Sequence, residues 1–227
     1  MNRTASYKDA IIKAIGHDGF IVTYPDKKLS FAFDPFDISE EEPVDYIFIS
    51  HPHYDHCDPA SIRKLLKPKT KVIAPECCQN ELAEFHDHLE LLADKEKHET
   101  KDLIYWAIPA YNIDKFRTPN EVFHPKELGG VGFIVEVDRT RFYHAGDTDN
   151  IPEMAGLKKI DVAFLPISGT FVMTMEEAIA AAKVIQPKAV VPMHYGKLLG
   201  SVAEATRFQN ILRSEIPVIV VTDAHHF

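Results

Sequence analysis

Four potential metal ligands fall within residues 51–56, which read HPHYDH. The proline between the first two histidines favours an extended backbone at His51, and residues two apart in an extended segment project to the same side. His51 and His53 can therefore share one metal ion, whereas Asp55 and His56 lie beyond the next turn and suit a second ion. Such a string should arise by chance only about once in several hundred chains of this composition. The alternative, a surface loop with solvated histidines, is disfavoured by the apolar segment directly before it.

Two later loops add further ligand types. Asp147 follows an apolar segment that ends at Ala145, and His194 follows another that ends at Met193. Taken alone, Asp147 would be a turn aspartate and His194 a buried supporting histidine. Because strand ends converge on one edge in layered α/β folds, these loops and residues 51–56 could meet.

Hydrophobic periodicity predicts the elements that must position these loops. The expected strands alternate increasingly with helices, and this pattern indicates an α/β layered class. The predicted strands cover residues 9–15, 20–24, 29–34, 44–50, 71–74, 102–109, 132–137, 141–145, 161–167, 189–193 and 216–221. The predicted helices cover residues 59–66, 75–85, a segment that begins at the capping box Thr174/Glu177, and one that begins at the capping box Ser201/Glu204.

Composition narrows the possible partners. The 227 residues, 45% of them hydrophobic, can form one α/β domain over residues 1–227. A net charge of −9 disfavours nucleic acid as a partner. The polar start MNRTASYKDA lacks the apolar run of a signal peptide or membrane span, so we expect a cytoplasmic protein with no membrane partner. Three cysteines, two of them adjacent, make a disulfide framework unexpected.

The segments HPHYDH, YHAGDTD and PMHYG, in this order, resemble the metallo-β-lactamase superfamily. The segments GHDGFIV, FDPF and PISGTFVMTMEEA look most like its small single-domain branch, which includes L-ascorbate-6-phosphate lactonase and uncharacterised Zn-dependent hydrolases. The resemblance implies a four-layer αββα sandwich with two metal ions at one edge. It also implies a ligand set: His51 and His53 for metal 1, Asp55, His56 and His194 for metal 2, and Asp147 bridging both.

The chain departs from the family pattern at one ligand of metal 1. The family usually supplies a third histidine from the middle of the chain, and here Asn112 occupies the corresponding turn. His124 lies in the same connection, and we favour it over Asn112 as the missing ligand. A site of imidazole and carboxylate fits zinc first, with manganese or iron as alternatives. His17 and Asp34 are candidates for supporting the metal ligands.

The resemblance implies metal-assisted hydrolysis of a small ester, lactone or phosphodiester by a bridging water that acts as hydroxide. Asp55 would orient this hydroxide and carry its proton, with Asp147 as the second catalytic carboxylate. Candidates for binding a small, possibly anionic substrate are Tyr111, Lys126, Thr170 and Tyr195. The alternatives are a metal-binding or sensing protein without turnover, a nuclease of the same superfamily, or a diiron oxygen-reducing variant, although the last typically carries glutamate where His53 stands. The chain could also form a homo-oligomer.

Overall fold

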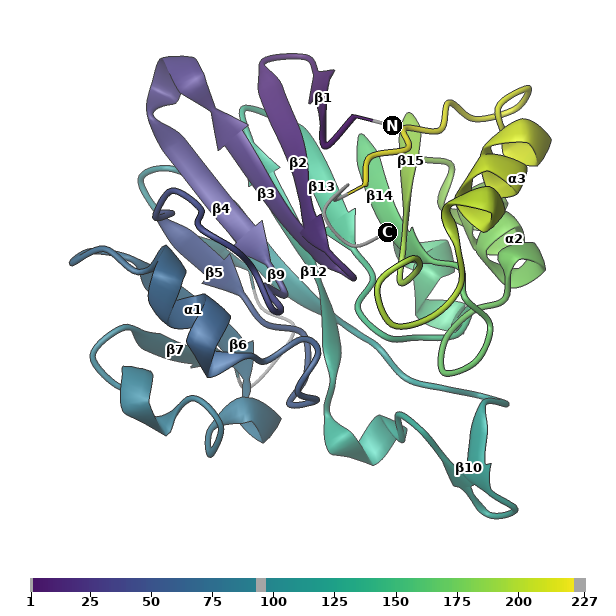
Figure 1. Cartoon of the computed structure of the whole chain (residues 1–227), viewed down its shortest axis with the longest axis horizontal. Helices are drawn as coiled ribbons and strands as arrows, with labels where there is room; N and C mark the ends of the chain where they lie inside the picture. Colours follow the sequence, from purple (N-terminus) through teal and green to yellow (C-terminus); the bar gives the residue numbers. More distant parts are fainter. Residues whose placement is uncertain (1, 93–96, 223–227) are drawn as a thin grey trace. The chain divides into compact units, whose positions relative to one another are not determined.

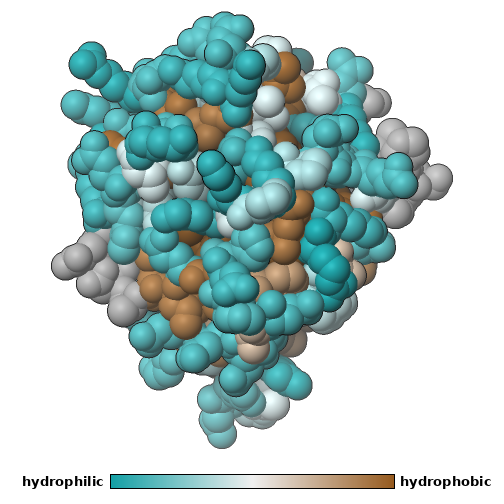
Figure 2. Space-filling view, turned by 90° about the vertical axis from the view of Figure 1, so that its left-hand side faces the viewer, coloured by the Kyte–Doolittle hydropathy of each residue, from teal (hydrophilic) through white to brown (hydrophobic). Residues whose placement is uncertain are grey.

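The computed structural model describes residues 2–92 and 97–222, whose contacts form two compact units (Figure 1). Among the described residues, unit 1 consists of residues 2–92 and 221–222, and unit 2 consists of residues 97–220. Within the described residues, no helix is long and apolar enough to cross a lipid bilayer. The face shown in Figure 2 is mainly hydrophilic, with hydrophobic residues in small patches between the polar ones.

Unit 1 is built on a mixed sheet in which the described strands pair in sequence order. The first four strands pair antiparallel, and the remaining pairs are parallel. The strands are β1 (Thr4–Tyr7), β2 (Ala10–Gly16), β3 (Gly19–Tyr24), β4 (Leu29–Phe33), β5 (Tyr46–Phe48), β6 (Lys71–Pro75) and β7 (Leu89–Leu92).

Helix α1 (Pro59–Leu65) connects β5 to β6, and it begins as the sequence predicts. The Asp58 side chain accepts a hydrogen bond from the Ala60 amide, and a proline occupies the first helical position. Ile62 and Leu65 of α1 are fully buried in the same apolar cluster as residues of β5 and β6. This packing holds the segment from β5 to α1, which includes residues 51–56, at both of its ends.

The predicted helix over residues 75–85 is wrong. The structure has two separate 3₁₀ turns there, Glu76–Cys78 and Ala83–Phe85. Most backbone bonds in this segment join residues three apart, as in the bond from the Gln79 amide to the Glu76 carbonyl. Residues 75–85 include two cysteines and an asparagine, which are weak helix formers, so local propensity does not favour a continuous α-helix there.

Unit 2 contains a second mixed sheet, with the order β15-β14-β13-β12-β9-β8 in the described residues. Helix α2 (Met175–Ile185) packs against β14 and against helix α3 (Val202–Leu212). The strands of this sheet and of a separate hairpin are β8 (His98–Glu99), β9 (Ile104–Pro109), β10 (Phe116–Thr118), β11 (Glu121–Val122), β12 (Val131–Val137), β13 (Thr140–His144), β14 (Val162–Pro166) and β15 (Ala189–Met193), with β10 and β11 forming the hairpin.

The expected strand over residues 216–221 is reduced to a single bridge between Val218 and Val190. Val190 receives a hydrogen bond from the Ile219 amide and donates one to the Pro217 carbonyl. Pro217 has no amide hydrogen and therefore cannot contribute a donor to a continuous ladder. The segment follows β15 without extending the sheet.

Both predicted capping boxes are present, and the one at α2 gives a stability prediction. The Thr174 hydroxyl accepts a hydrogen bond from the Glu177 amide, and the Glu177 carboxylate accepts one from the Thr174 amide. Thr174→Ala should lower the free energy of unfolding by about 1 kcal/mol, measured by urea denaturation. The matched control is Thr206→Ala, because Thr206 lies inside α3. Alanine is the better helix former there, so a change within about 0.5 kcal/mol is expected. Equal losses in the two variants would contradict the capping argument.

Candidate metal centre

The first group of candidate ligands lies in the loop between β5 and α1 of unit 1. His51 Nε2 lies 3.0 Å from His53 Nδ1, and the two ring centroids are 4.6 Å apart. The centroid of the His56 ring lies 4.2 Å from that of His51. The extended backbone predicted at the proline thus brings the first two imidazoles to the same side. Three imidazoles gather in one loop, and His51 and His56 are almost completely buried.

The Asp34 carboxylate, at the end of β4, connects two of these imidazoles. Its Oδ1 accepts a hydrogen bond from the Ser50 amide (2.7 Å), and its Oδ2 accepts one from the Ser50 hydroxyl (2.6 Å). The same Oδ2 lies 2.9 Å from His56 Nδ1. Because the Ser50 hydroxyl gives its hydrogen to Asp34, it can only accept from His51 Nδ1, which lies 2.9 Å away. Both histidines therefore carry hydrogen on Nδ1 and a lone pair on Nε2, the tautomer that metal binding through Nε2 requires.

The turn between β2 and β3 brings two further groups to the unit 1 ligands. His17 Nε2 lies 3.3 Å from Asp55 Oδ2, and its ring centroid lies 5.6 Å from that of His56. Asp18 is completely buried, with Oδ2 3.9 Å from His56 Nε2. The sequence analysis anticipated His17 but missed Asp18, because an aspartate in a Gly-His-Asp-Gly turn is ordinary turn chemistry.

Backbone geometry at these positions is unusual for the residues that occupy them. His17 has φ +47°, Asp34 has φ +37°, and His194 in unit 2 has φ +60°. Residues other than glycine rarely adopt this left-handed backbone conformation, and the exceptions concentrate at functional sites. Gly19 lies in the same turn as His17, and glycine is required there for a different reason. A Cβ atom at this position would lie 2.9 Å from the Gly16 carbonyl oxygen. The fold thus accepts local strain where the candidate ligands and their supports lie.

The second group of candidate ligands lies in unit 2, after β13 and β15. His124 Nε2 lies 3.2 Å from Asp147 Oδ2, and His194 Nε2 lies 3.4 Å from the same oxygen. All three side chains are at least 95% buried. His194 Nδ1 lies 2.7 Å from the Ser168 hydroxyl. Two imidazole nitrogens therefore face one carboxylate oxygen, an arrangement that suits a cation shared among the three.

Asn112, the alternative to His124, has its side-chain oxygen turned to that histidine. Asn112 Oδ1 accepts a hydrogen bond from the His124 amide (2.9 Å) and lies 3.0 Å from His124 Nδ1. Of these two residues, His124 is the one that faces Asp147. The role of His124 as a metal ligand stays a prediction.

The candidate substrate contacts Tyr111 and Lys126 lie together with Glu153. The Tyr111 hydroxyl donates a hydrogen bond to Glu153 (2.9 Å), and Lys126 Nζ lies 2.9 Å from Glu153 and 4.4 Å from the centroid of the Tyr111 ring. Burial and the hydrogen bond with Glu153 raise the pKa of Tyr111 above its usual range. Thr170 is exposed between β14 and α2, whereas Tyr195 is buried, and this burial raises the pKa of its hydroxyl.

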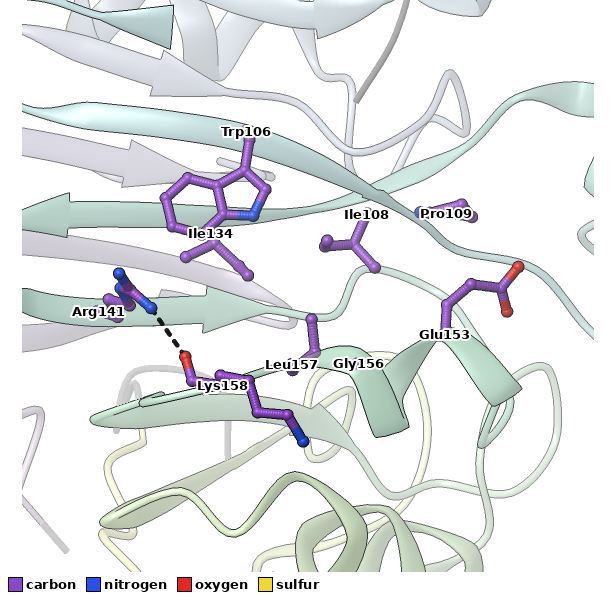
Figure 3. A pocket seen from close by; sticks show the side chains of 9 residues that line it. All are labelled: Trp106, Ile108, Pro109, Ile134, Arg141, Glu153, Gly156, Leu157 and Lys158. Atoms are coloured by element: carbon purple, nitrogen blue, oxygen red, sulfur yellow. Dashed lines mark hydrogen bonds between the residues drawn. The ribbon is translucent and has the colours of Figure 1, made fainter. Parts of the chain in front are cut away.

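Glu153 also borders a pocket of about 340 Å³ in unit 2 (Figure 3). Trp106 of β9 and Ile134 of β12 form its apolar side, and the Arg141 guanidinium donates a hydrogen bond to the Lys158 carbonyl at one end. The volume is at the lower end for small-molecule sites. None of the candidate metal ligands is among the residues that line this pocket.

The donor chemistry of both groups fits a metal ion. The candidate ligands are imidazoles and carboxylates, which suit zinc, manganese or iron. Cys57 follows His56 but is buried in the apolar cluster of unit 1 with Cys78, and all three cysteines of the chain are free thiols.

Comparisons with known proteins show the family to which the chain is similar. A family model described as the β-lactamase superfamily domain matches residues 11–194. A UPF0173 metal-dependent hydrolase of Caldivirga maquilingensis is 32% identical over 223 residues, which cover 92% of each chain. A structure from Parabacteroides distasonis, assigned to a metal-dependent hydrolase, has a TM-score of 0.82 and 31% identity, and the match covers 97% of this chain and 98% of that one.

A more distant likeness shows that the fold alone does not determine the reaction. CmlA, a diiron β-hydroxylase from Streptomyces venezuelae, has a TM-score of 0.71 at 12% identity, over 96% of this chain and 53% of that one. The expected α/β class with mixed sheets and helices is confirmed by the family match and by the more similar structure. The chain therefore belongs to the metallo-β-lactamase superfamily, among its UPF0173 metal-dependent hydrolases.

Proposed function

We propose that the chain is a two-metal hydrolase that cleaves a small ester, lactone or phosphodiester. In this proposal the ions would be held by ligands from both groups, and Asp147 would supply a carboxylate to both. The ligands are His51, His53, Asp55 and His56 of unit 1 and His124, Asp147 and His194 of unit 2.

The observation that carries the proposal is that neighbouring side chains face the Nδ1 atoms of the candidate histidine ligands. In unit 1, the Ser50 hydroxyl faces Nδ1 of His51 and the Asp34 carboxylate faces Nδ1 of His56, and in unit 2 the Asn112 side-chain oxygen faces Nδ1 of His124. Metal-binding histidines usually have their second nitrogen held in this way by a carboxylate, a carbonyl or a similar partner. Histidines in a solvated surface loop would form hydrogen bonds with water instead of with buried side chains. Full-length similarity to metal-dependent hydrolases supports the same conclusion.

The side chains of this centre divide the work of hydrolysis. When bound, the two ions would supply an acidified water as nucleophile and positive charge that stabilises the anionic transition state. Asp55 is the residue we assign to proton transfer, because its carboxylate is 17% exposed and lies 3.3 Å from His17 Nε2, which can orient it. The buried Asp34 holds the imidazoles of His51 and His56 in one orientation through the reaction.

The substrate contacts favour testing neutral as well as anionic compounds. Glu153 already pairs with Lys126 and with the Tyr111 hydroxyl, so an incoming anion has to compete with an existing carboxylate. A neutral lactone or ester avoids this competition and can bind through hydrogen bonds alone. The substrate panel therefore includes a γ-lactone, p-nitrophenyl acetate and bis(p-nitrophenyl) phosphate.

The proposal is tested by counting metals and measuring turnover on the same preparation. Inductively coupled plasma mass spectrometry should find two equivalents of zinc, manganese or iron per chain, and at least one compound of the panel should be hydrolysed. Two ions without turnover would favour a metal-binding or sensing protein. Cleavage of single-stranded RNA alone would favour a nuclease, and oxygen uptake with an added reductant would favour a diiron oxygenase chemistry.

Metal removal gives a prediction that does not depend on the substrate. A ligand present at about 100 times its dissociation constant stabilises the folded state by about 2.7 kcal/mol. For a chain of this length, chelation should thus lower the Tm by about 5–10 °C, measured by differential scanning calorimetry. Adding back zinc or manganese should restore both Tm and activity. Mass spectrometry should first confirm that the metal has been removed. If the Tm of the metal-free protein is then unchanged, the result contradicts the proposed metal centre.

A further inference from the structure

We infer that Asn112 is a positioning residue that fixes the tautomer of His124, and that Asp149 in turn fixes the orientation of the Asn112 amide. The inference rests on the proposed function, because it gives a reason for asparagine at the position where the family resemblance leads one to expect a metal-binding histidine. In this inference Asn112 orients a metal ligand and does not itself bind the metal. All the residues involved belong to unit 2.

The first step is the orientation of the Asn112 amide. Its Nδ2 donates hydrogen bonds to Asp149 Oδ1 (3.2 Å) and to the Phe171 carbonyl (2.9 Å). Both partners are acceptors only, because a carbonyl and an ionised carboxylate have no hydrogen to donate. The Asp149 carboxylate also accepts hydrogen bonds from the backbone amides of Ile113 (2.6 Å) and Asp114 (3.0 Å). A flipped amide would direct its oxygen at two other oxygens. The network therefore determines which side-chain atom of Asn112 faces His124.

The second step is the protonation of His124. Asn112 Oδ1 faces the backbone amide of His124 at 2.9 Å and His124 Nδ1 at 3.0 Å, while the backbone amide of Asn112 donates to the His124 carbonyl at 2.8 Å. An amide oxygen has only lone pairs, so His124 Nδ1 must carry hydrogen. In the neutral ring Nε2 then carries the lone pair, and it is Nε2 that faces Asp147. Asn112 thereby prepares His124 for metal binding in the same way that Asp34 prepares His56.

The third step is the burial of these side chains, which excludes water as an alternative hydrogen-bond partner. The side chains of Asn112, His124 and Asp149 are all almost completely buried. Lys115 Nζ lies 3.3 Å from Asp149 Oδ1 and 2.9 Å from Glu177, so a cation balances the buried carboxylate. A buried hydrogen-bond chain has few alternative arrangements, since a mispaired group loses its partner and cannot bond to water instead. The tautomer of His124 is thus determined by residues 12 and 25 positions away along the chain, at positions 112 and 149.

The test exchanges the donor and acceptor between positions 112 and 149. Asp149→Asn alone directs two NH₂ groups at each other and favours a flipped Asn112 amide, whereas Asn112→Asp alone places two carboxylates together. Each single change should weaken zinc binding by about 10–100-fold, measured by competition with a chromophoric chelator. The double variant Asn112→Asp/Asp149→Asn restores one donor facing one acceptor and leaves an acceptor at position 112 facing His124, while the hydrogen bond to the Phe171 carbonyl stays lost. It should recover at least tenfold of the lost affinity. Losses that simply add in the double variant would overturn the inference.

A spectroscopic measurement on the wild-type protein is independent of any variant. With ¹⁵N-labelled histidine, the His124 ring in metal-free protein should show a protonated Nδ1. In Asp149→Asn the protonation of Nδ1 should decrease, whereas in the exposed control Asn120→Asp it should be unchanged. An unprotonated Nδ1 in the wild type would overturn the inference. The measurement is made without metal or substrate, so a failure of the proposed hydrolase function would leave its result interpretable.

Discussion

Replacing Asp147 by alanine will lower the hydrolytic rate by about 10³-fold or more and will reduce the metal content of the purified protein. Asp147 Oδ2 is the atom that both His124 Nε2 and His194 Nε2 face, at 3.2 and 3.4 Å. Without the carboxylate, two buried imidazoles remain with no negative charge between them to balance a divalent ion. Rate and metal content should therefore fall together, as measured by steady-state kinetics and mass spectrometry on one preparation.

The controls separate this effect from a general loss of charge or of histidine. Asp87 and His86 are exposed neighbours in unit 1, with side-chain exposures of 85% and 76%. Asp87→Ala and His86→Ala should leave rate and metal content unchanged. His53→Ala should behave like Asp147→Ala, because His53 Nδ1 faces His51 Nε2 in the other ligand group. Full activity in both His53→Ala and Asp147→Ala would remove the two-metal mechanism.

Asp34→Ala will have the second-largest effect, although Asp34 is not itself assigned as a metal ligand. It will lower metal affinity by about 10–100-fold, because the hydrogen of His56 Nδ1 and the hydroxyl of Ser50 lose their common acceptor. It will also lower the free energy of unfolding by about 1–3 kcal/mol, since buried polar groups lose partners. The measurements are chelator competition and urea denaturation in metal-free protein.

A conservative replacement distinguishes the two consequences of the Asp34 change. Asp34→Asn retains one acceptor oxygen but places an NH₂ group near either Ser50 or His56. It should retain more stability than Asp34→Ala while still weakening metal binding. Asparagine also tolerates the positive φ of this position better than alanine does. Equal metal affinity in Asp34→Asn and the wild type would show that the carboxylate does not orient the histidines.

The proximity of His51 and His53 could be predicted from sequence because it depends on local backbone geometry. The two residues are separated by one proline, and an extended segment places their side chains on one side whatever the rest of the fold does. The capping boxes at Thr174 and Ser201 were predictable for the same reason. The helix over residues 75–85 was not, because weak local propensity left its backbone to be determined by packing.

The supporting network could be predicted only in part, because its partners lie far apart in the sequence. Asp34 was a candidate supporter, but its hydrogen bonds with Ser50 and His56 cross 16 and 22 residues. The choice between Asn112 and His124 depended on a carboxylate 37 residues away from Asn112. Sequence spacing contains no information about which atom of an amide faces a neighbour. Hydrogen-bond chemistry in the folded chain supplies that information.

The position of Trp106 determines what optical unfolding experiments on this protein report. It is the one tryptophan in the chain, and it lies on β9 in unit 2 with the Arg141 guanidinium carbon 5.6 Å and Lys97 Nζ 4.4 Å from its ring. Its emission therefore follows the loosening of the sheet of unit 2, whereas far-ultraviolet circular dichroism averages over both sheets. Superimposable transitions from the two signals would identify one cooperative folding unit, and separated midpoints would identify two.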